Sequence, residues 1–79
     1  MRVDVVLPDL GDDAVQDVTV SAWLVEKGAR LVEGDDLLEI TTDKAAFCVP
    51  CPRDGTLAEC AVVEGDVIHV GDVFGALEV

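Results

Sequence analysis

The sequence predicts an all-β domain built from two similar halves that pack face to face. No segment of the 79 residues repeats its apolar side chains with a period of 3.6, so no helix is expected. Turn-forming residues recur every few positions, which limits the strands to short ones. The chain also repeats itself at an offset of 37 residues, with Gly28 matching Gly65 and Gly34-Asp35 matching Gly71-Asp72. Halves of this size are too small to bury a core each, so they should share one.

The expected strands follow one another along the chain, separated by Gly, Asp and Pro. Val, Leu, Ile, Thr and Ala dominate eight segments, at 3–7, 18–25, 31–32, 36–42, 45–50, 56–63, 67–70 and 73–79. Pro8 ends the first segment, and the Glu26-Lys27-Gly28 turn ends the second. The second is the strongest strand in the sequence, and its Trp23 is expected in the core or on a sheet face.

Charge and cysteine content limit the possible partners. Seventeen acidic and five basic residues give a net charge of −12, which opposes binding to nucleic acid or an anionic membrane. The same charge favours a soluble, monomeric domain whose partners present positive surfaces. No apolar run approaches the roughly 18 residues of a membrane span. Three cysteines cannot form a complete set of internal disulfides, so a reducing cytoplasm is the expected compartment.

Asp43-Lys44 lies between two expected strands and predicts the loop of a hairpin. Lysine does not favour the left-handed conformation, so a type I turn or a slightly longer loop is expected rather than type I′. Either form places the Lys44 amine in solvent. In the internal repeat Thr42 matches Val79, so a two-fold relation would put the hairpin tip and the chain end at opposite ends of the domain. A lysine at such a tip can also be simply a solubilising charge.

With these residues in view, the chain resembles the lipoyl domains of 2-oxo acid dehydrogenase complexes over essentially its whole length. The resemblance is carried by Leu7-Pro8-Asp9-Leu10-Gly11, Trp23-Leu24-Val25-Glu26-Lys27-Gly28, Val32-Glu33-Gly34-Asp35, Leu38-Glu39-Ile40-Thr41-Thr42-Asp43-Lys44-Ala45, Val49-Pro50-Cys51-Pro52-Arg53-Asp54-Gly55, Glu64-Gly65-Asp66 and Val70-Gly71-Asp72. It implies a flattened barrel or sandwich of two four-stranded antiparallel sheets related by a pseudo-two-fold axis (a barrel-sandwich hybrid). Residues 1–79 would then be a single carrier domain.

The same resemblance implies that Lys44 carries lipoic acid in amide linkage. The domain would have no active site of its own, although it can belong to a dihydrolipoamide acyltransferase. A lipoate ligase or an octanoyl or lipoyl transferase would modify Lys44. The modified arm would then carry acyl groups and reducing equivalents between a thiamine-dependent 2-oxo acid dehydrogenase, an acyltransferase domain and lipoamide dehydrogenase.

The neighbours of Lys44 are expected to serve recognition rather than catalysis. Asp43 favours the charged amine, so the activation needed for acylation must come from the modifying enzyme. Ala45 is small and would let that enzyme's pocket close around the lysine, or it is an ordinary first residue of a strand. A docking surface for partner enzymes could include Asp9, Asp12 and Asp13, which otherwise form a solvated acidic loop.

Four alternatives remain open at this stage. An unmodified structural or interaction domain could share the fold. Biotinyl domains share it too, but they typically flank their lysine with methionines, where this chain has Asp43 and Ala45. A redox pair at Cys48 and Cys51 is disfavoured because no helix follows to lower a thiol pKa. A zinc site is disfavoured because one of its two ligand pairs lacks the usual spacing; its ligands would be Cys48, Cys51, Cys60 and His69.

Overall fold

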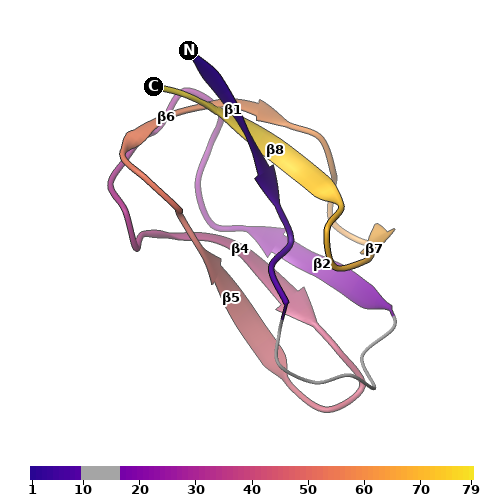
Figure 1. Cartoon of the computed structure of the whole chain (residues 1–79). Helices are drawn as coiled ribbons and strands as arrows, with labels where there is room; N and C mark the ends of the chain where they lie inside the picture. Colours follow the sequence, from indigo (N-terminus) through magenta and orange to yellow (C-terminus); the bar gives the residue numbers. More distant parts are fainter. Residues whose placement is uncertain (10–16) are drawn as a thin grey trace.

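The computed structural model describes residues 1–9 and 17–79 and confirms the all-β prediction (Figure 1). Its eight strands are β1 (Arg2–Val6), β2 (Val18–Trp23), β3 (Arg30–Leu31), β4 (Asp36–Thr41), β5 (Ala46–Pro50), β6 (Gly55–Cys60), β7 (Val67–Ile68) and β8 (Val73–Glu78). Each expected strand is present, and the differences lie at the strand ends. Nowhere in the described residues is there a helix long and apolar enough to cross a membrane.

The strands form two four-stranded antiparallel sheets, as predicted. One has the order β1-β8-β6-β3 and the other the order β5-β4-β2-β7. Exchanging β1 with β5, β2 with β6, β3 with β7 and β4 with β8 converts one order into the other. This exchange confirms the predicted pseudo-two-fold relation between the halves. No strand ladder joins the two sheets within the described part of the chain, so the flattened barrel is open between them.

The internal repeat in the sequence matches the strand boundaries. β2, β3 and β4 coincide with β6, β7 and β8 after a shift of 37 residues. β1 coincides with β5 only after a shift of 44, because the connection from β1 to β2 is seven residues longer than the connection from β5 to β6. The extra residues therefore fall between β1 and β2 in the sequence and leave the 37-residue repeat of the other strands unchanged.

The glycines of the repeat are turn residues that need a left-handed backbone. Gly28, Gly34, Gly65 and Gly71 have φ between 91° and 95°, which side chains with a Cβ rarely adopt. Three of them precede an aspartate whose carboxylate accepts the amide N–H three residues back. The distances are 3.0 Å for Val32 to Asp35, 2.9 Å for Val63 to Asp66 and 2.8 Å for His69 to Asp72. Each Gly-Asp pair thus stabilises its own turn.

Two of these turns also hold the residue that follows an edge strand. The Gly34 amide donates to the Cys51 carbonyl at 2.9 Å, and the Cys51 amide donates to the Asp35 carbonyl at 2.6 Å. In the other half, Gly71 donates to Leu7 at 2.8 Å, and Leu7 donates to Asp72 at 2.9 Å. These backbone pairs connect β5 to the β3–β4 turn and β1 to the β7–β8 turn, so each turn joins elements of the two sheets.

The core between the sheets is mostly aliphatic, as the composition predicts. Buried Val, Leu and Ile side chains from both halves surround Phe74, which is fully buried. Trp23, expected in the core or on a sheet face, is half-buried and packs against the core cluster. Its ring centroid lies 5.7 Å from that of Phe74, and its indole N–H donates to the Val62 carbonyl at 2.8 Å. Trp23 and Phe74 therefore pack against each other, one at the margin of the core and one inside it.

Gly75→Ala is expected to destabilise the domain by about 1–3 kcal/mol because a Cβ there overpacks the contact between β8 and β6. That Cβ would lie 2.7 Å from the Glu59 carbonyl oxygen and 3.2 Å from Cη2 of Trp23. Gly34→Ala is the matched control, because its Cβ meets no atom within 4 Å and its cost of about 1–2 kcal/mol comes from the backbone alone. Urea unfolding measures both costs. Native Trp23 fluorescence should change only in Gly75→Ala, and an unchanged spectrum would contradict this packing.

Candidate functional site

The β4–β5 hairpin projects from the end of the domain opposite the two chain termini (Figure 1). Thr41 pairs with Ala46 as the last rung of the ladder, so residues 42–45 form the connection. The Thr42 amide donates to the Ala45 carbonyl at 2.9 Å, which leaves Asp43 and Lys44 at the tip. The predicted loop and its position at the far end from the termini are both observed.

The Thr42 hydroxyl organises the backbone of this tip. Its Oγ1 accepts the amide N–H groups of Lys44 and Ala45, each at 3.2 Å, and donates to the Ala45 carbonyl at 3.2 Å. No non-glycine residue in the described ranges has a positive φ, so the turn is not type I′. Sequence reasoning placed Thr42 at the end of a strand and missed this role. A threonine two residues before the loop lysine was the available signal.

Asp43, Lys44 and Ala45 are all exposed at the hairpin tip. The lysine is therefore accessible from outside the domain, with an acidic residue on one side and a small residue on the other. Asp9 is also exposed, shortly after the end of β1. Asp12 and Asp13, the other residues predicted for partner docking, lie outside the described residues.

The base of the hairpin is braced by neighbouring strands. β4 is an inner strand, with β5 on one side and β2 on the other. One row of paired residues crosses the whole sheet next to the tip, formed by Ala46, Thr41, Thr19 and Val67. The hydroxyls of Ser21 and Thr41 are also hydrogen-bonded to each other. The sheet therefore restrains β4, the strand that leads into the Lys44 loop.

The three cysteines are free and differ in exposure. Cys48 is exposed on β5, whereas Cys51 is buried in the core and its thiol donates to the Arg53 carbonyl at 3.0 Å. Burial raises the pKa of the Cys60 thiol, and the nearby positive charge of Lys27 partly offsets this increase. The residues thus differ in surroundings although Cys48 and Cys51 are close in sequence.

The four residues considered as zinc ligands, Cys48, Cys51, Cys60 and His69, do not form a metal site in the described structure. Among residues 1–9 and 17–79, no three or more His, Cys, Asp or Glu side chains are arranged to hold a metal ion. The His69 imidazole instead has acidic partners, with Nε2 3.0 Å from Asp17 Oδ1 and Nδ1 3.5 Å from Asp72 Oδ2. His69 directly follows β7, and its imidazole lies between Asp17, which precedes β2, and Asp72, which precedes β8.

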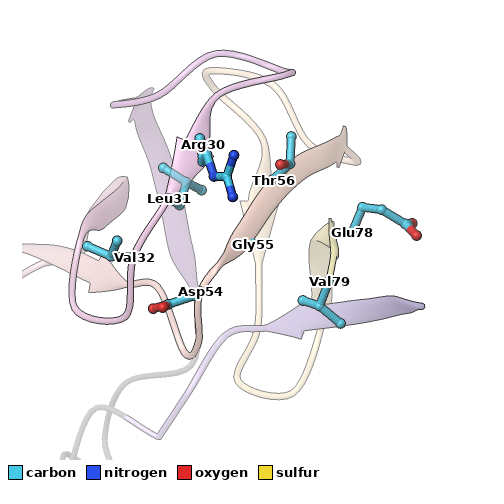
Figure 2. A pocket seen from close by; sticks show the side chains of 8 residues that line it. All are labelled: Arg30, Leu31, Val32, Asp54, Gly55, Thr56, Glu78 and Val79. Atoms are coloured by element: carbon cyan, nitrogen blue, oxygen red, sulfur yellow. The ribbon is translucent and has the colours of Figure 1, made fainter.

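A hollow of about 530 Å³ lies near the chain termini rather than at the hairpin (Figure 2). Its lining residues are Arg30, Leu31, Val32, Asp54, Gly55, Thr56, Glu78 and Val79. The Met1 amino group donates to the Val79 carbonyl at 2.8 Å, which places both termini beside it. The pseudo-two-fold axis relates this end to the Lys44 end, and the hollow takes no part in presenting the lysine.

Alkylation with iodoacetamide near pH 8 is expected to modify Cys48 first, because it is the exposed thiol. Cys60 should react more slowly, since its raised pKa leaves less thiolate at that pH, and Cys51 should be slowest because it is buried. Timed quenching followed by peptide mapping gives the three rates. Cys48→Ser should remove the fast phase alone, and faster labelling of Cys51 than of Cys48 would contradict the described burial.

Comparison with known proteins agrees with this geometry. The biotin/lipoyl family model, described as "Biotin-requiring enzyme", matches residues 3–77. The chain is 35% identical over 78 residues to the dihydrolipoyllysine-residue succinyltransferase component of the 2-oxoglutarate dehydrogenase complex of Bartonella vinsonii subsp. berkhoffii, covering 99% of this chain and 19% of that protein. It is 39% identical over 67 residues to the dihydrolipoyllysine-residue acetyltransferase component of the pyruvate dehydrogenase complex of Staphylococcus aureus, covering 85% and 15%. The chain therefore spans less than a quarter of the length of these relatives.

A solved structure shows the same arrangement of strands. The lipoyl domain of the 2-oxoglutarate dehydrogenase complex from Azotobacter vinelandii superposes with a TM-score of 0.74 at 29% sequence identity, covering 96% of this chain and 95% of that one. Lipoyl domains are carriers rather than enzymes, and they hold lipoic acid covalently on a lysine. The chain belongs to the biotin/lipoyl domain family, and its resemblance to the lipoyl domains of that family is confirmed.

Proposed function

We propose that residues 1–79 form a lipoyl carrier domain in which Lys44 is the attachment site. The observation that carries the proposal is the exposed lysine at the tip of a braced hairpin, at the opposite end of the domain from the termini. A group attached there would extend from an exposed end of the hairpin toward another enzyme's active site. The arm would carry acyl groups and reducing equivalents within a 2-oxo acid dehydrogenase complex.

Lys44 and its neighbours fit lipoic acid as a tethered group. The lysine needs only an accessible amine, and Asp43 and Ala45 are both open to contact by a modifying enzyme. The hydrogen bonds of Thr42 hold the backbone of the tip in one shape for recognition. A lipoate ligase or an octanoyl or lipoyl transferase would supply the activated acyl donor. When attached, lipoic acid supplies a disulfide that accepts an acyl group and two electrons.

In the proposed function, the domain contributes by positioning the attached group at the active sites of other enzymes. A tethered intermediate has a high effective concentration at each active site that the tether can reach. The proposed sites belong to a thiamine-dependent 2-oxo acid dehydrogenase, an acyltransferase domain and lipoamide dehydrogenase. Asp9, Asp12 and Asp13 are proposed to contribute to docking, and Asp9 is exposed as this requires.

Lipoic acid is preferred to biotin as the attached group. The lysine lies between aspartate and alanine, and the chain's one methionine is Met1. The relatives compared above are also named for dihydrolipoyl-lysine. Three free thiols agree with a reducing compartment, and we place the domain in the cytoplasm.

Co-expression with a lipoate ligase and added lipoate is expected to give a lipoyl mass increment on Lys44 alone. The matched variants are Lys44→Arg, which should remain folded and unmodified, and Lys27→Arg, which should be modified normally because Lys27 is the chain's only other lysine. Intact mass and peptide mapping give the result. An unmodified Lys44, under conditions that modify a control lipoyl domain, would support the unmodified structural domain instead. A biotin increment would keep the fold and change the cofactor.

Thr42→Val is expected to lower the rate of lipoylation roughly threefold, because the tip loses the hydroxyl that holds two of its amides. Thr42→Ser keeps the hydroxyl and should be modified at close to the original rate. Rates are measured by mass spectrometry with limiting ligase. Equal rates for Thr42→Val and the unchanged domain would show that the hydroxyl does not position the lysine.

A further inference from the structure

The two halves of the domain differ in the exposed residues at four equivalent positions. Shifting the first half by 37 residues brings charged residues onto valines, namely Glu26 onto Val63, Arg30 onto Val67, Glu33 onto Val70 and Asp36 onto Val73. All four charged residues are exposed, and the valines are exposed by 65%, 55%, 48% and 45%. We refer to these four valines as the valine strip.

The fold does not require apolar residues at these positions. The same backbone positions in the first half accept Glu, Arg and Asp, so the turns and strands form with charged side chains. The core contacts of the second half come instead from buried neighbours, Ile68 and Phe74. The opposite exchange occurs at Val32, which is exposed and matches His69, and a further exposed apolar residue of the first half is Leu24, which matches Ala61. The strip differs from these because its members follow one another through two consecutive turns.

The strip begins in the sheet that carries the Lys44 hairpin. Val67 is the last member of the row of paired residues that runs from Ala46 at the base of the hairpin across β4 and β2. Val63 and Val70 lie in the turns on either side of β7, at the edge of the sheet beside β2 (Figure 1). Val73 pairs with Val6, another exposed valine, and extends the strip onto the other sheet. An enzyme that closes over the hairpin would therefore lie next to this surface.

Acidic residues border the strip. Within 63–73 they are Glu64, Asp66 and Asp72. The one basic side chain in this described segment is His69, which already faces the carboxylates of Asp17 and Asp72. A second copy of the chain would bring the same acidic border and another net charge of −12 to the interface. Charge complementarity therefore favours a partner with lysine and arginine around an apolar centre.

We propose that the valine strip is a docking surface for a partner enzyme that acts on the group carried by Lys44, through an apolar patch bordered by lysine and arginine. This proposal rests on the proposed carrier function. A small apolar contact with an acidic border suits a transient complex, because charge attraction speeds the encounter while the limited contact allows release. Such release is necessary for a carrier that visits several active sites.

The test uses lipoylated domain and the thiamine-dependent components of the pyruvate and 2-oxoglutarate dehydrogenase complexes as probes. Val67→Arg and Val70→Glu copy the residues of the first half, and Val32→His is the matched control because it makes the equivalent exchange outside the strip. Both strip variants should lower kcat/KM for reductive acylation about tenfold, through KM, whereas Val32→His should not. The two strip variants change the net charge in opposite directions, so a loss in both would identify the apolar contact.

The outcomes separate the docking proposal from the carrier function. If Lys44 carries no lipoyl group, the carrier function fails. If Lys44 is lipoylated and acylated but both strip variants react at the original rate, the docking proposal alone is overturned. Sedimentation velocity provides a further test, because a dimer that Val67→Arg dissociates would show that a second copy covers the strip. Unchanged thermal unfolding of the variants, whose replaced side chains are exposed, confirms that folding is not the cause of any loss.

Discussion

The structure depends on one core that neither half of the chain can form alone. Each sheet takes two strands from the first half and two from the second, and the buried side chains of both halves form one core cluster. The backbone hydrogen bonds from the Gly34 and Gly71 turns to Cys51 and Leu7 then connect each turn, which joins the two sheets, to the residue that follows an edge strand. Folding must therefore bring together strands that are far apart in the sequence, and the domain is expected to be a single cooperative unit.

This shared core also explains how the hairpin can present an exposed lysine without an enclosing pocket. β4 is paired on both sides, and its inward residues Leu37, Leu38 and Ile40 are fully buried. The strand is thus held up to Thr41, and the Thr42 hydroxyl continues the restraint into the loop. The hydrogen-bonded part of the hairpin thus ends at its tip, from which the proposed tether on Lys44 would extend.

The features with a proposed function lie where the two halves of the domain differ. The tip of the hairpin that connects β4 to β5 lies outside the strands that the 37-residue shift aligns. The longer connection after β1 and the valine strip are also asymmetric. Strand positions that maintain the core follow the repeat, whereas the exposed positions are free to differ because they are not packed in the core.

The sequence by itself determined the strands, the turns and the site of the lysine, because each depends on local chemistry. Turn glycines, the aspartates after them and runs of strand-forming residues are all visible in neighbouring residues, and the repeat of Gly28 and Gly34 at Gly65 and Gly71 indicated the symmetry. The distinct environments of Cys48, Cys51 and Cys60 became evident only in the tertiary structure. The same is true of the role of Thr42 and the position of Val67 in a row with the hairpin base. These features arise from pairing between distant strands, which the local sequence does not specify because each contact depends on where another segment lies.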